Sequence, residues 1–160
     1  MATAAVNLSD FNPKDLPNTA NMKFGLVVAE WNSEITEALY QGAFDTLRAT
    51  GTPENKIVRV NVPGTFELVF GSKLLCEEND FDAIIAIGTV IQGETKHFDY
   101  VCQGVTYGIQ ELNLSYETPV IFCVLTDNTM EQSRARSGGV HGNKGVECAV
   151  AAIKMASISV

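Results

Sequence analysis

The stretch GTVIQGETKHFDY, residues 88–100, combines residue types that suit phosphate and proton chemistry. It comes within one residue of the phosphate-binding loop G-x-x-x-x-G-K-[ST], because Glu94 stands where that loop has its lysine. Gly93, Glu94 and Thr95 would open a helix, whose free N–H groups and dipole favour an anion. Glu94 would repel a triphosphate, so the loop suits a single phosphate whose cation comes from elsewhere. An ordinary strand-to-helix turn capped by Thr95 is the alternative.

Three basic residues near the C-terminus are candidates for that cation: Arg134, Arg136 and Lys144. His97, expected in the first turn of the helix, is a candidate proton carrier. The helix dipole disfavours a cation there and so favours the neutral imidazole, which can accept a proton. A histidine that only caps the turn is an equal alternative. We expect His141, in SGGVHGNKG, to be a surface loop residue.

Two other segments carry unusual side chains. Thr65, Phe66 and Glu67 follow a Pro-Gly turn, and Trp31 is the only tryptophan of the chain. Aromatic faces and a carboxylate would suit a polar aromatic ligand. Glu67 could equally be an acid stabilised by a helix dipole, and Trp31 a hydrophobic staple. Arg136, expected in the last turn of a helix, also has such a structural explanation.

Four apolar segments predict the strands that position these residues. Three read as nearly continuous apolar runs, which is typical of strands buried on both faces of a parallel sheet, and the second alternates more. The segments are Phe24–Ala29, Lys56–Val62, Ala83–Ile87 and Thr118–Leu125. Helical patterns occupy residues 35–47 (capped by Asn32 or Ser33 and ended by Gly51), 65–79, 97 to before Pro119, 129–137 and 143–157.

The alternation of strands and helices, with right-handed crossovers, predicts a three-layer α/β/α sandwich around a four-stranded parallel sheet, a flavodoxin-like fold. Residues 1–21 are expected to form a flexible arm or a disordered tail, and residues 22–160 a single domain. Open parallel sheets bind ligands beyond the carboxyl ends of their strands. This rule selects four loops, Glu30–Asn32, Pro63–Glu67, Gly88–His97 and Thr126–Asn128.

Composition limits the function classes. With 160 residues and 46% hydrophobic residues, the chain suits one domain with a substantial core. A formal net charge of -8 disfavours nucleic acid as a partner. No signal peptide and no apolar run of ~20 residues is present, so we expect a soluble cytoplasmic protein that does not bind membranes. Its four cysteines form no C-x-x-C pair, which favours free thiols over zinc or disulfides.

Five segments in order, AEWNSEIT, VPGTFEL, GTVIQGETKHFDYV, VLTDNTMEQ and RSGGVHGNKG, resemble the 6,7-dimethyl-8-ribityllumazine synthase family. The resemblance covers nearly all of residues 23–155. It implies the penultimate step of riboflavin biosynthesis, in which 5-amino-6-(D-ribitylamino)uracil condenses with 3,4-dihydroxy-2-butanone 4-phosphate. Phosphate and water are lost, and neither a metal nor an organic cofactor is needed.

By position in these motifs, the resemblance implies a set of residues for each substrate. The residues that would contact the uracil substrate are Trp31, Thr65, Phe66, Glu67, Val90 and Ile91. The phosphate pocket would consist of Gly93, Glu94, Thr95 and Arg136, and His97 would move protons. In this family the site lies between adjacent subunits of a pentamer. The neighbour would contribute Phe122, Arg136 and Lys144.

Two departures from the family pattern carry expectations of their own. Trp31 stands where phenylalanine is usual, and members with tryptophan there can bind riboflavin, so flavin retention is a hypothesis. Gln92 stands where arginine is common, which leaves more of the phosphate charge to Arg136. The short link Gly138–Gly142 suits a sixty-subunit shell of twelve pentamers, and association with riboflavin synthase is a further hypothesis.

Two rivals from other classes share the fold. One is a binding module that holds a flavin or phosphate without catalysis, and the other is a shell-forming protein without activity. The presence of both His97 and Arg136 favours the enzyme, because a binder needs the arginine but not a proton carrier.

Overall fold

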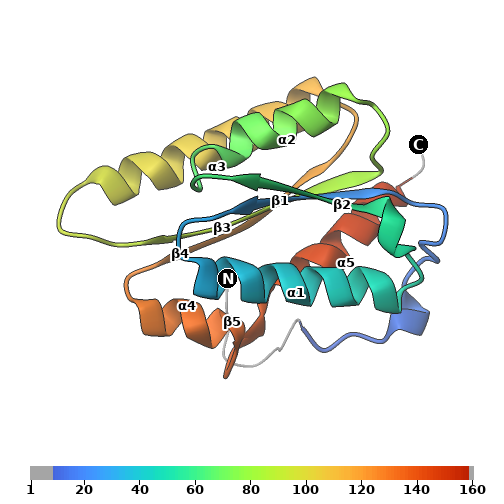
Figure 1. Ribbon diagram of the computed structural model, residues 1–160, viewed down its shortest axis with the longest axis horizontal. Coiled ribbons are helices and arrows are strands. Elements are labelled where there is room, and N and C mark those ends of the chain that lie inside the picture. The colour runs from blue at the N-terminus through green and yellow to red at the C-terminus, as the bar shows by residue number, and fades with distance from the viewer. Residues whose placement is uncertain (1–8, 159–160) are drawn as a thin grey trace.

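The computed structural model describes residues 9–158. Its centre is a parallel four-stranded sheet with the order β2-β1-β3-β4. The strands are β1 (Phe24–Ala29), β2 (Ile57–Val62), β3 (Ala83–Ile91) and β4 (Val120–Asp127). Figure 1 shows α2 (Leu68–Glu77) and α3 (His97–Ser115) on one face, and α1 (Ser33–Ala49), α4 (Met130–Arg136) and α5 (Lys144–Ala156) on the other. The predicted three-layer sandwich is confirmed.

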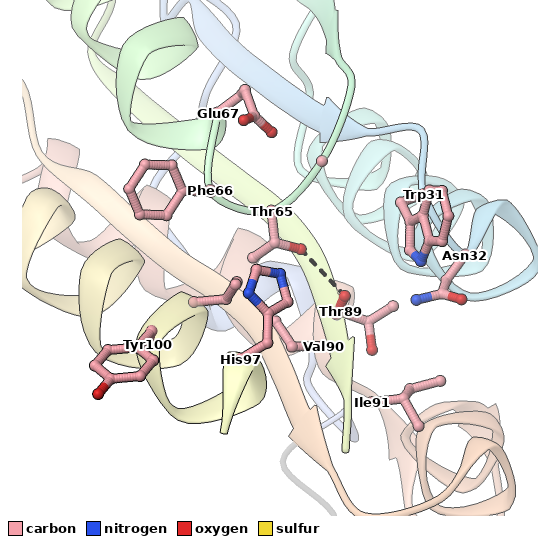
Figure 2. A pocket seen from close by; sticks show the side chains of 12 residues that line it. Trp31, Asn32, Thr65, Phe66, Glu67, Thr89, Val90, Ile91, His97 and Tyr100 are labelled. Atoms are coloured by element: carbon pink, nitrogen blue, oxygen red, sulfur yellow. Dashed lines mark hydrogen bonds between the residues drawn. The ribbon is translucent and has the colours of Figure 1, made fainter. Parts of the chain in front are cut away.

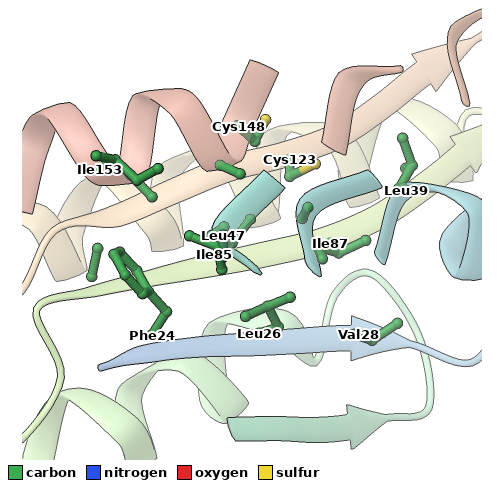
Figure 3. Packing of buried hydrophobic residues seen from close by; sticks show 14 of the residues in the cluster. Phe24, Leu26, Val28, Leu39, Leu47, Ile85, Ile87, Cys123, Cys148 and Ile153 are labelled. Atoms are coloured by element: carbon green, nitrogen blue, oxygen red, sulfur yellow. The ribbon is translucent and has the colours of Figure 1, made fainter. Parts of the chain in front are cut away.

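Each face of the sheet has its own apolar core. On the side of α1 and α5, Phe24 and Leu26 of β1 pack in one cluster with Ile153 of α5 (Figure 3). On the side of α2 and α3, Val27 of β1 belongs to a second cluster with Ile109. Successive residues of a strand point to opposite faces. Burial on both faces therefore explains why β1 reads as a continuous apolar run.

Two predicted boundaries were wrong next to the expected site. β3 continues to Ile91, because Gly88–Ile91 pair with Val124–Asp127 of β4. The loop expected from Gly88 therefore begins at Gln92. Helix α2 begins at Leu68 rather than at Thr65, and the three preceding residues form a turn.

Among the predicted caps and ends of α1 and α4, only the cap of α1 differs from the structure. Asn32 precedes α1 with a left-handed φ of 60°, and no side-chain bond caps that helix, so the predicted cap is wrong. The cap of α4 is confirmed, because the Thr129 hydroxyl accepts a bond from the Gln132 amide. Gly51 follows the end of α1 with φ 108°, as its predicted role requires.

The segment between α4 and α5 is a small antiparallel hairpin, β5 (Ser137–Gly139) and β6 (Gly142–Asn143), where we predicted only a link. The Asn143 side chain accepts a bond of 2.8 Å from the Gly145 amide and so caps α5. Its Nδ2 donates to the carbonyl of Ala38 at 2.9 Å. Asn143 therefore ties the hairpin and the start of α5 to α1.

Residues 1–8 of the predicted arm lie outside the described residues. Further along, Pro13–Asp15 form a 3₁₀ turn, and the fully buried Thr19 bonds to the hydroxyls of Thr50 and Thr52. This part of the arm packs against the end of α1. None of the helices in the part of the chain that the structure describes is long and apolar enough to cross a membrane.

Candidate functional site

A pocket of about 680 Å³ opens at the carboxyl ends of β1, β2 and β3 (Figure 2). Strand β1 connects to β2 on one side and pairs with β3 on the other, which is the switch point where open sheets bind ligands. In Figure 2, Trp31 lies on one side, Phe66 and Tyr100 on the other, and His97 between them. The lining residues are Trp31, Asn32, Gly64, Thr65, Phe66, Glu67, Thr89, Val90, Ile91, His97, Tyr100 and Val101.

The floor of the pocket depends on contact between the turn after β2 and strand β3. The Thr65 hydroxyl donates a hydrogen bond of 3.1 Å to the carbonyl of Thr89. A side chain at Gly88 would place its Cβ 2.8 Å from Thr65 Oγ1. Glycine at position 88 therefore lets the turn rest on the strand and brings Thr65 into the site.

Two exposed aromatic side chains stand at the sides of the pocket. The Phe66 ring rests on α3 at Gly104, where a Cβ would come within 2.6 Å of it. Trp31 is 73% exposed, and its amide bonds to the carbonyl of Pro63 at 3.1 Å, which holds it against the next loop. Flat apolar faces with the Glu67 carboxylate nearby suit a planar, polar ligand.

The predicted phosphate loop lies at the end of the pocket that contains His97. The His97 amide, which starts α3, bonds to Thr95 Oγ1 at 3.4 Å. Gly93, Glu94 and Thr95 are exposed and are not among the lining residues. A Cβ at Gly93 would meet nothing within 4 Å. There is open space beside this loop on the single chain.

Three predicted residues lie away from the pocket. Phe122 is on β4 and packs against the core on the α2 and α3 side. Arg136 ends α4, and its Nη1 donates to the Gln132 carbonyl at 3.1 Å. Lys144 starts α5 and is bonded to Glu147 at 2.6 Å. A single chain thus unites the predicted uracil-side residues with His97, but not with Phe122, Arg136 or Lys144.

Each of the three basic candidates, Arg134, Arg136 and Lys144, lies within 4 Å of a carboxylate oxygen. Burial alone would lower the pKa of Lys144, but the hydrogen bond and the charge of Glu147 raise it overall, so the side chain stays cationic. Arg134 donates two hydrogen bonds to Glu34, at 2.7 and 3.0 Å. Carboxylates thus occupy Arg134 and Lys144 at short distance, whereas the nearest carboxylate oxygen to Arg136 is that of Asp127 at 3.8 Å, which leaves Arg136 as the better phosphate candidate.

Several lining residues were not predicted: Asn32, Gly64, Thr89, Tyr100 and Val101. Tyr100 follows His97 by one helical turn, so the helix period could have found it. Gly64 and Thr89 lie in loops that the sequence selected, but neither was singled out as a site residue. Asn32 adopts a left-handed backbone, in which asparagine is enriched, so its residue type was the available signal in a loop that was selected.

Metal and disulfide chemistry find no support in residues 9–158. No group of three or more His, Cys, Asp or Glu residues there could hold a metal ion. The four cysteines are free, and Cys76, Cys123 and Cys148 are buried.

Comparison with known proteins agrees with this geometry. The family model of 6,7-dimethyl-8-ribityllumazine synthase matches residues 21–159. The 6,7-dimethyl-8-ribityllumazine synthase of Christiangramia forsetii is 59% identical over 99% of this chain and 95% of its own length. The enzyme of the same name from Porphyromonas gingivalis is 52% identical over 99% of this chain and 98% of its own. The chain belongs to the 6,7-dimethyl-8-ribityllumazine synthase family.

Proposed function

We propose that this chain condenses 5-amino-6-(D-ribitylamino)uracil with 3,4-dihydroxy-2-butanone 4-phosphate to form 6,7-dimethyl-8-ribityllumazine in riboflavin biosynthesis. One observation carries the proposal: in a member of this family, Trp31, Phe66, Glu67 and His97 line a single pocket at the switch point of the sheet. Trp31 would stack on the pyrimidine ring, and Phe66 and Glu67 would contact the ribityl chain. The backbones of Val90 and Ile91 would hold the edge of the ring.

The chemistry needs proton transfer at several steps. The 5-amino group attacks the ketone and loses water to form an imine. A proton then leaves the neighbouring carbon as phosphate departs, and the resulting enol becomes a ketone. The ribitylamino nitrogen attacks this carbonyl and loses a second water, which closes the ring. His97 faces the pocket and is the group we assign to these proton transfers.

The pocket of one chain lacks a cation for the phosphate. Its lining residues include neither lysine nor arginine. We assign this role to Arg136 of a neighbouring subunit, with Phe122 and Lys144 completing the same half of the site. Gly93, Glu94 and Thr95 would surround the phosphate from the first subunit, with their backbone N–H groups at the start of α3.

An exposed apolar surface supports the assembly. Phe70 of α2 is 63% exposed, and Tyr107 and Leu114 of α3 are 66% and 76% exposed. Apolar surface of this kind is commonly covered by another protein. We propose that the chain forms a cytoplasmic pentamer whose active sites are shared between adjacent subunits. Twelve such pentamers would form a shell, and this shell would associate with riboflavin synthase.

The reaction is tested by mixing both substrates with the protein and following the lumazine product by fluorescence. A rate equal to the uncatalysed background would contradict the enzyme and favour the flavin- or phosphate-binding rival. The shared site is tested by complementation between Arg136→Ala and His97→Asn chains. Mixed assemblies should regain activity, because some interfaces combine an intact His97 with an intact Arg136. Activity in a stable monomer would contradict the shared site.

A further inference from the structure

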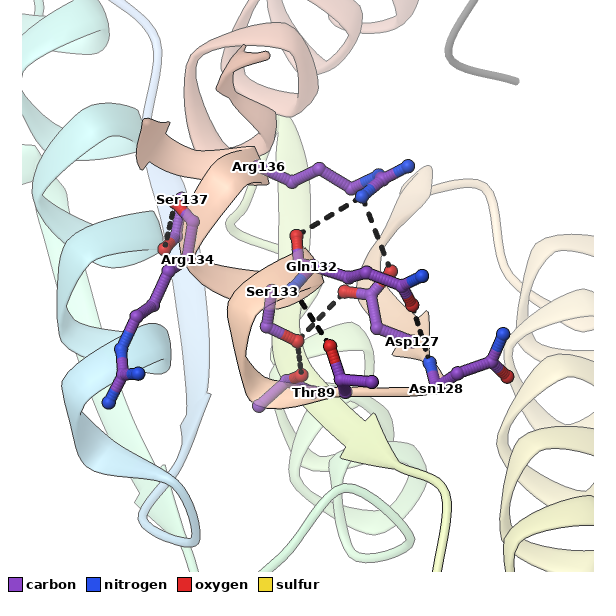
Figure 4. Close-up of polar contacts among 9 residues, drawn as sticks. Thr89, Asp127, Asn128, Gln132, Ser133, Arg134, Arg136 and Ser137 are labelled. Carbon is purple, nitrogen blue, oxygen red and sulfur yellow. Dashed lines mark hydrogen bonds and ion pairs between the residues drawn. The ribbon is translucent and has the colours of Figure 1, made fainter. Parts of the chain in front are cut away.

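We propose that Asp127 is a positioning residue, which fixes the guanidinium of Arg136 in the orientation that receives the substrate phosphate. This inference rests on the proposed function, because it takes Arg136 as the phosphate cation. Asp127 is the last residue of β4, and its side chain is 9% exposed. Figure 4 shows its carboxylate facing the guanidinium of Arg136.

Asp127 contacts α4 through both carboxylate oxygens. Oδ2 accepts a hydrogen bond of 2.8 Å from the hydroxyl of Ser133, which is fully buried. Oδ1 lies 3.8 Å from Nη1 of Arg136. The carboxylate thus joins the end of the sheet to two residues one helical turn apart on α4.

In the hydrogen bonds that lead from Thr89 through Ser133 to Asp127, each hydroxyl donates toward the carboxylate. An ionised carboxylate only accepts, so the single hydroxyl proton of Ser133 is used on Asp127. In the 3.3 Å contact between Thr89 and Ser133, Thr89 must therefore be the donor. The Thr89 carbonyl accepts from Thr65 in the pocket floor. A chain of bonds consequently fixes Asp127 relative to the pocket of its own subunit.

The buried carboxylate needs a positive partner, since removing an ion from water is costly unless it is paired. Arg136 supplies this charge from the last turn of α4. Its Nη1 also donates to the Gln132 carbonyl at 3.1 Å. Both contacts use Nη1, and no residue among 9–158 bonds to Nε or Nη2, so these donors can bind a phosphate. An arginine held in advance loses less conformational freedom when the anion binds.

The kinetic test compares Asp127→Asn with the wild type. The amide keeps the size of the side chain and an oxygen for Ser133, but it loses the charge that attracts Arg136. We expect KM for the phosphate-bearing substrate to rise about 10- to 100-fold, since small misplacements of a binding group have effects of this size. KM for the uracil substrate should change less than about twofold. Ser133→Ala should also raise KM for the phosphate-bearing substrate, by a smaller factor than Asp127→Asn.

A matched control is Glu131→Gln, which makes the same acid-to-amide change on the exposed side of α4. It should leave both KM values unchanged. An unchanged KM for the phosphate-bearing substrate in Asp127→Asn would overturn the proposal. If Asp127→Asn does not fold, Ser133→Ala decides alone, and a normal KM there has the same meaning.

A second measurement does not depend on turnover. It distinguishes positioning of Arg136 by Asp127 from a simple effect of the negative charge of Asp127. Binding of inorganic phosphate is measured by calorimetry in the wild type, Asp127→Asn, Arg136→Ala and the double variant. Asp127→Asn should weaken binding in the presence of Arg136 and have no further effect in its absence. Tighter binding in Asp127→Asn would mean that Asp127 only offsets charge, and would refute the proposal. A wild type that binds phosphate with this coupling but forms no lumazine would instead refute the proposed function.

Discussion

Arg134 and Glu34, which are 100 positions apart, are joined by two hydrogen bonds of 2.7 and 3.0 Å between guanidinium and carboxylate. The pair connects α4 to the first turn of α1, two residues after Asn32 of the pocket. The hydrogen bond from Arg134 lowers the pKa of Glu34 below its ordinary value of 4.5. The link therefore stays ionised into mildly acidic solution.

The lowered pKa sets the pH range in which this pair stabilises the fold. A carboxyl group with a depressed folded-state pKa contributes stability above its unfolded pKa and loses it as pH falls through the folded value. The melting temperature of Glu34→Gln should therefore lie below that of the wild type at pH 7. We expect this difference to persist down to about pH 4.5 and to close only at lower pH.

The control for this titration is Glu117→Gln, which neutralises an exposed carboxylate between α3 and β4. Its melting temperature should follow the wild type across the range. The difference in melting temperature between Glu34→Gln and the wild type should not close near pH 6, nor persist unchanged to pH 3. Either result would contradict a stabilising pair with Arg134 that lowers the pKa of Glu34.

His97 should affect turnover more than binding. His97→Asn keeps a polar side chain at the start of α3 but removes the group that accepts and returns protons. One such group contributes about 10²–10⁴-fold, so we expect kcat to fall within that range with little change in either KM. Arg136→Ala should remove productive use of the phosphate substrate, because the residues that line the pocket of one chain include no lysine or arginine that could replace the neighbour's guanidinium.

Rescue tests the assignment of His97 further. Free imidazole added to His97→Ala should restore part of the lost rate, since the vacated space faces the pocket. No response to imidazole, combined with near-normal kcat, would show that His97 only caps its helix.

The layers and the strands of this fold could be predicted because burial on both faces produces unmistakable apolar runs, as in β1. The same signal misplaced the end of β3. Gly88 and Thr89 look like loop residues, but pairing with Val124 and Leu125 of β4 keeps them in the sheet. Pairing of this kind depends on a strand more than thirty residues away and leaves no local pattern.

The candidate site was predictable in part, since the switch-point rule and the motifs led to the same loops. Trp31, Glu67 and His97 all reach one pocket. The lining residues that were not predicted depend on contacts between distant segments, such as the hydrogen bond from the Thr65 hydroxyl to the Thr89 carbonyl. Lys144 and Arg136 remain proposals, because their place in the site depends on a second chain.

Trp31 allows ligand binding to be observed directly, since it is the only tryptophan in the chain and lines the pocket. A flavin stacked on the indole should quench its fluorescence, and the titration should saturate at one flavin per chain. Trp31→Phe, which keeps an aromatic face, should weaken riboflavin binding when this is followed by flavin fluorescence. Equal affinity in both proteins would contradict the hypothesis that Trp31 retains flavin.

Gly145→Ala and Gly93→Ala should change stability in opposite directions. A Cβ at Gly145 would overlap the carbonyl oxygen of Leu39 and push α5 away from α1, whereas a Cβ at Gly93 meets nothing within 4 Å. Overpacking costs about 1–3 kcal/mol, which exceeds the gain of at most about 1 kcal/mol from alanine in a helix. Gly93→Ala should instead gain about 0.4–1 kcal/mol by restricting the unfolded chain. Urea unfolding at one protein concentration measures the free energy of unfolding of each variant. A Gly145→Ala chain as stable as the wild type would refute the close contact between α5 and α1.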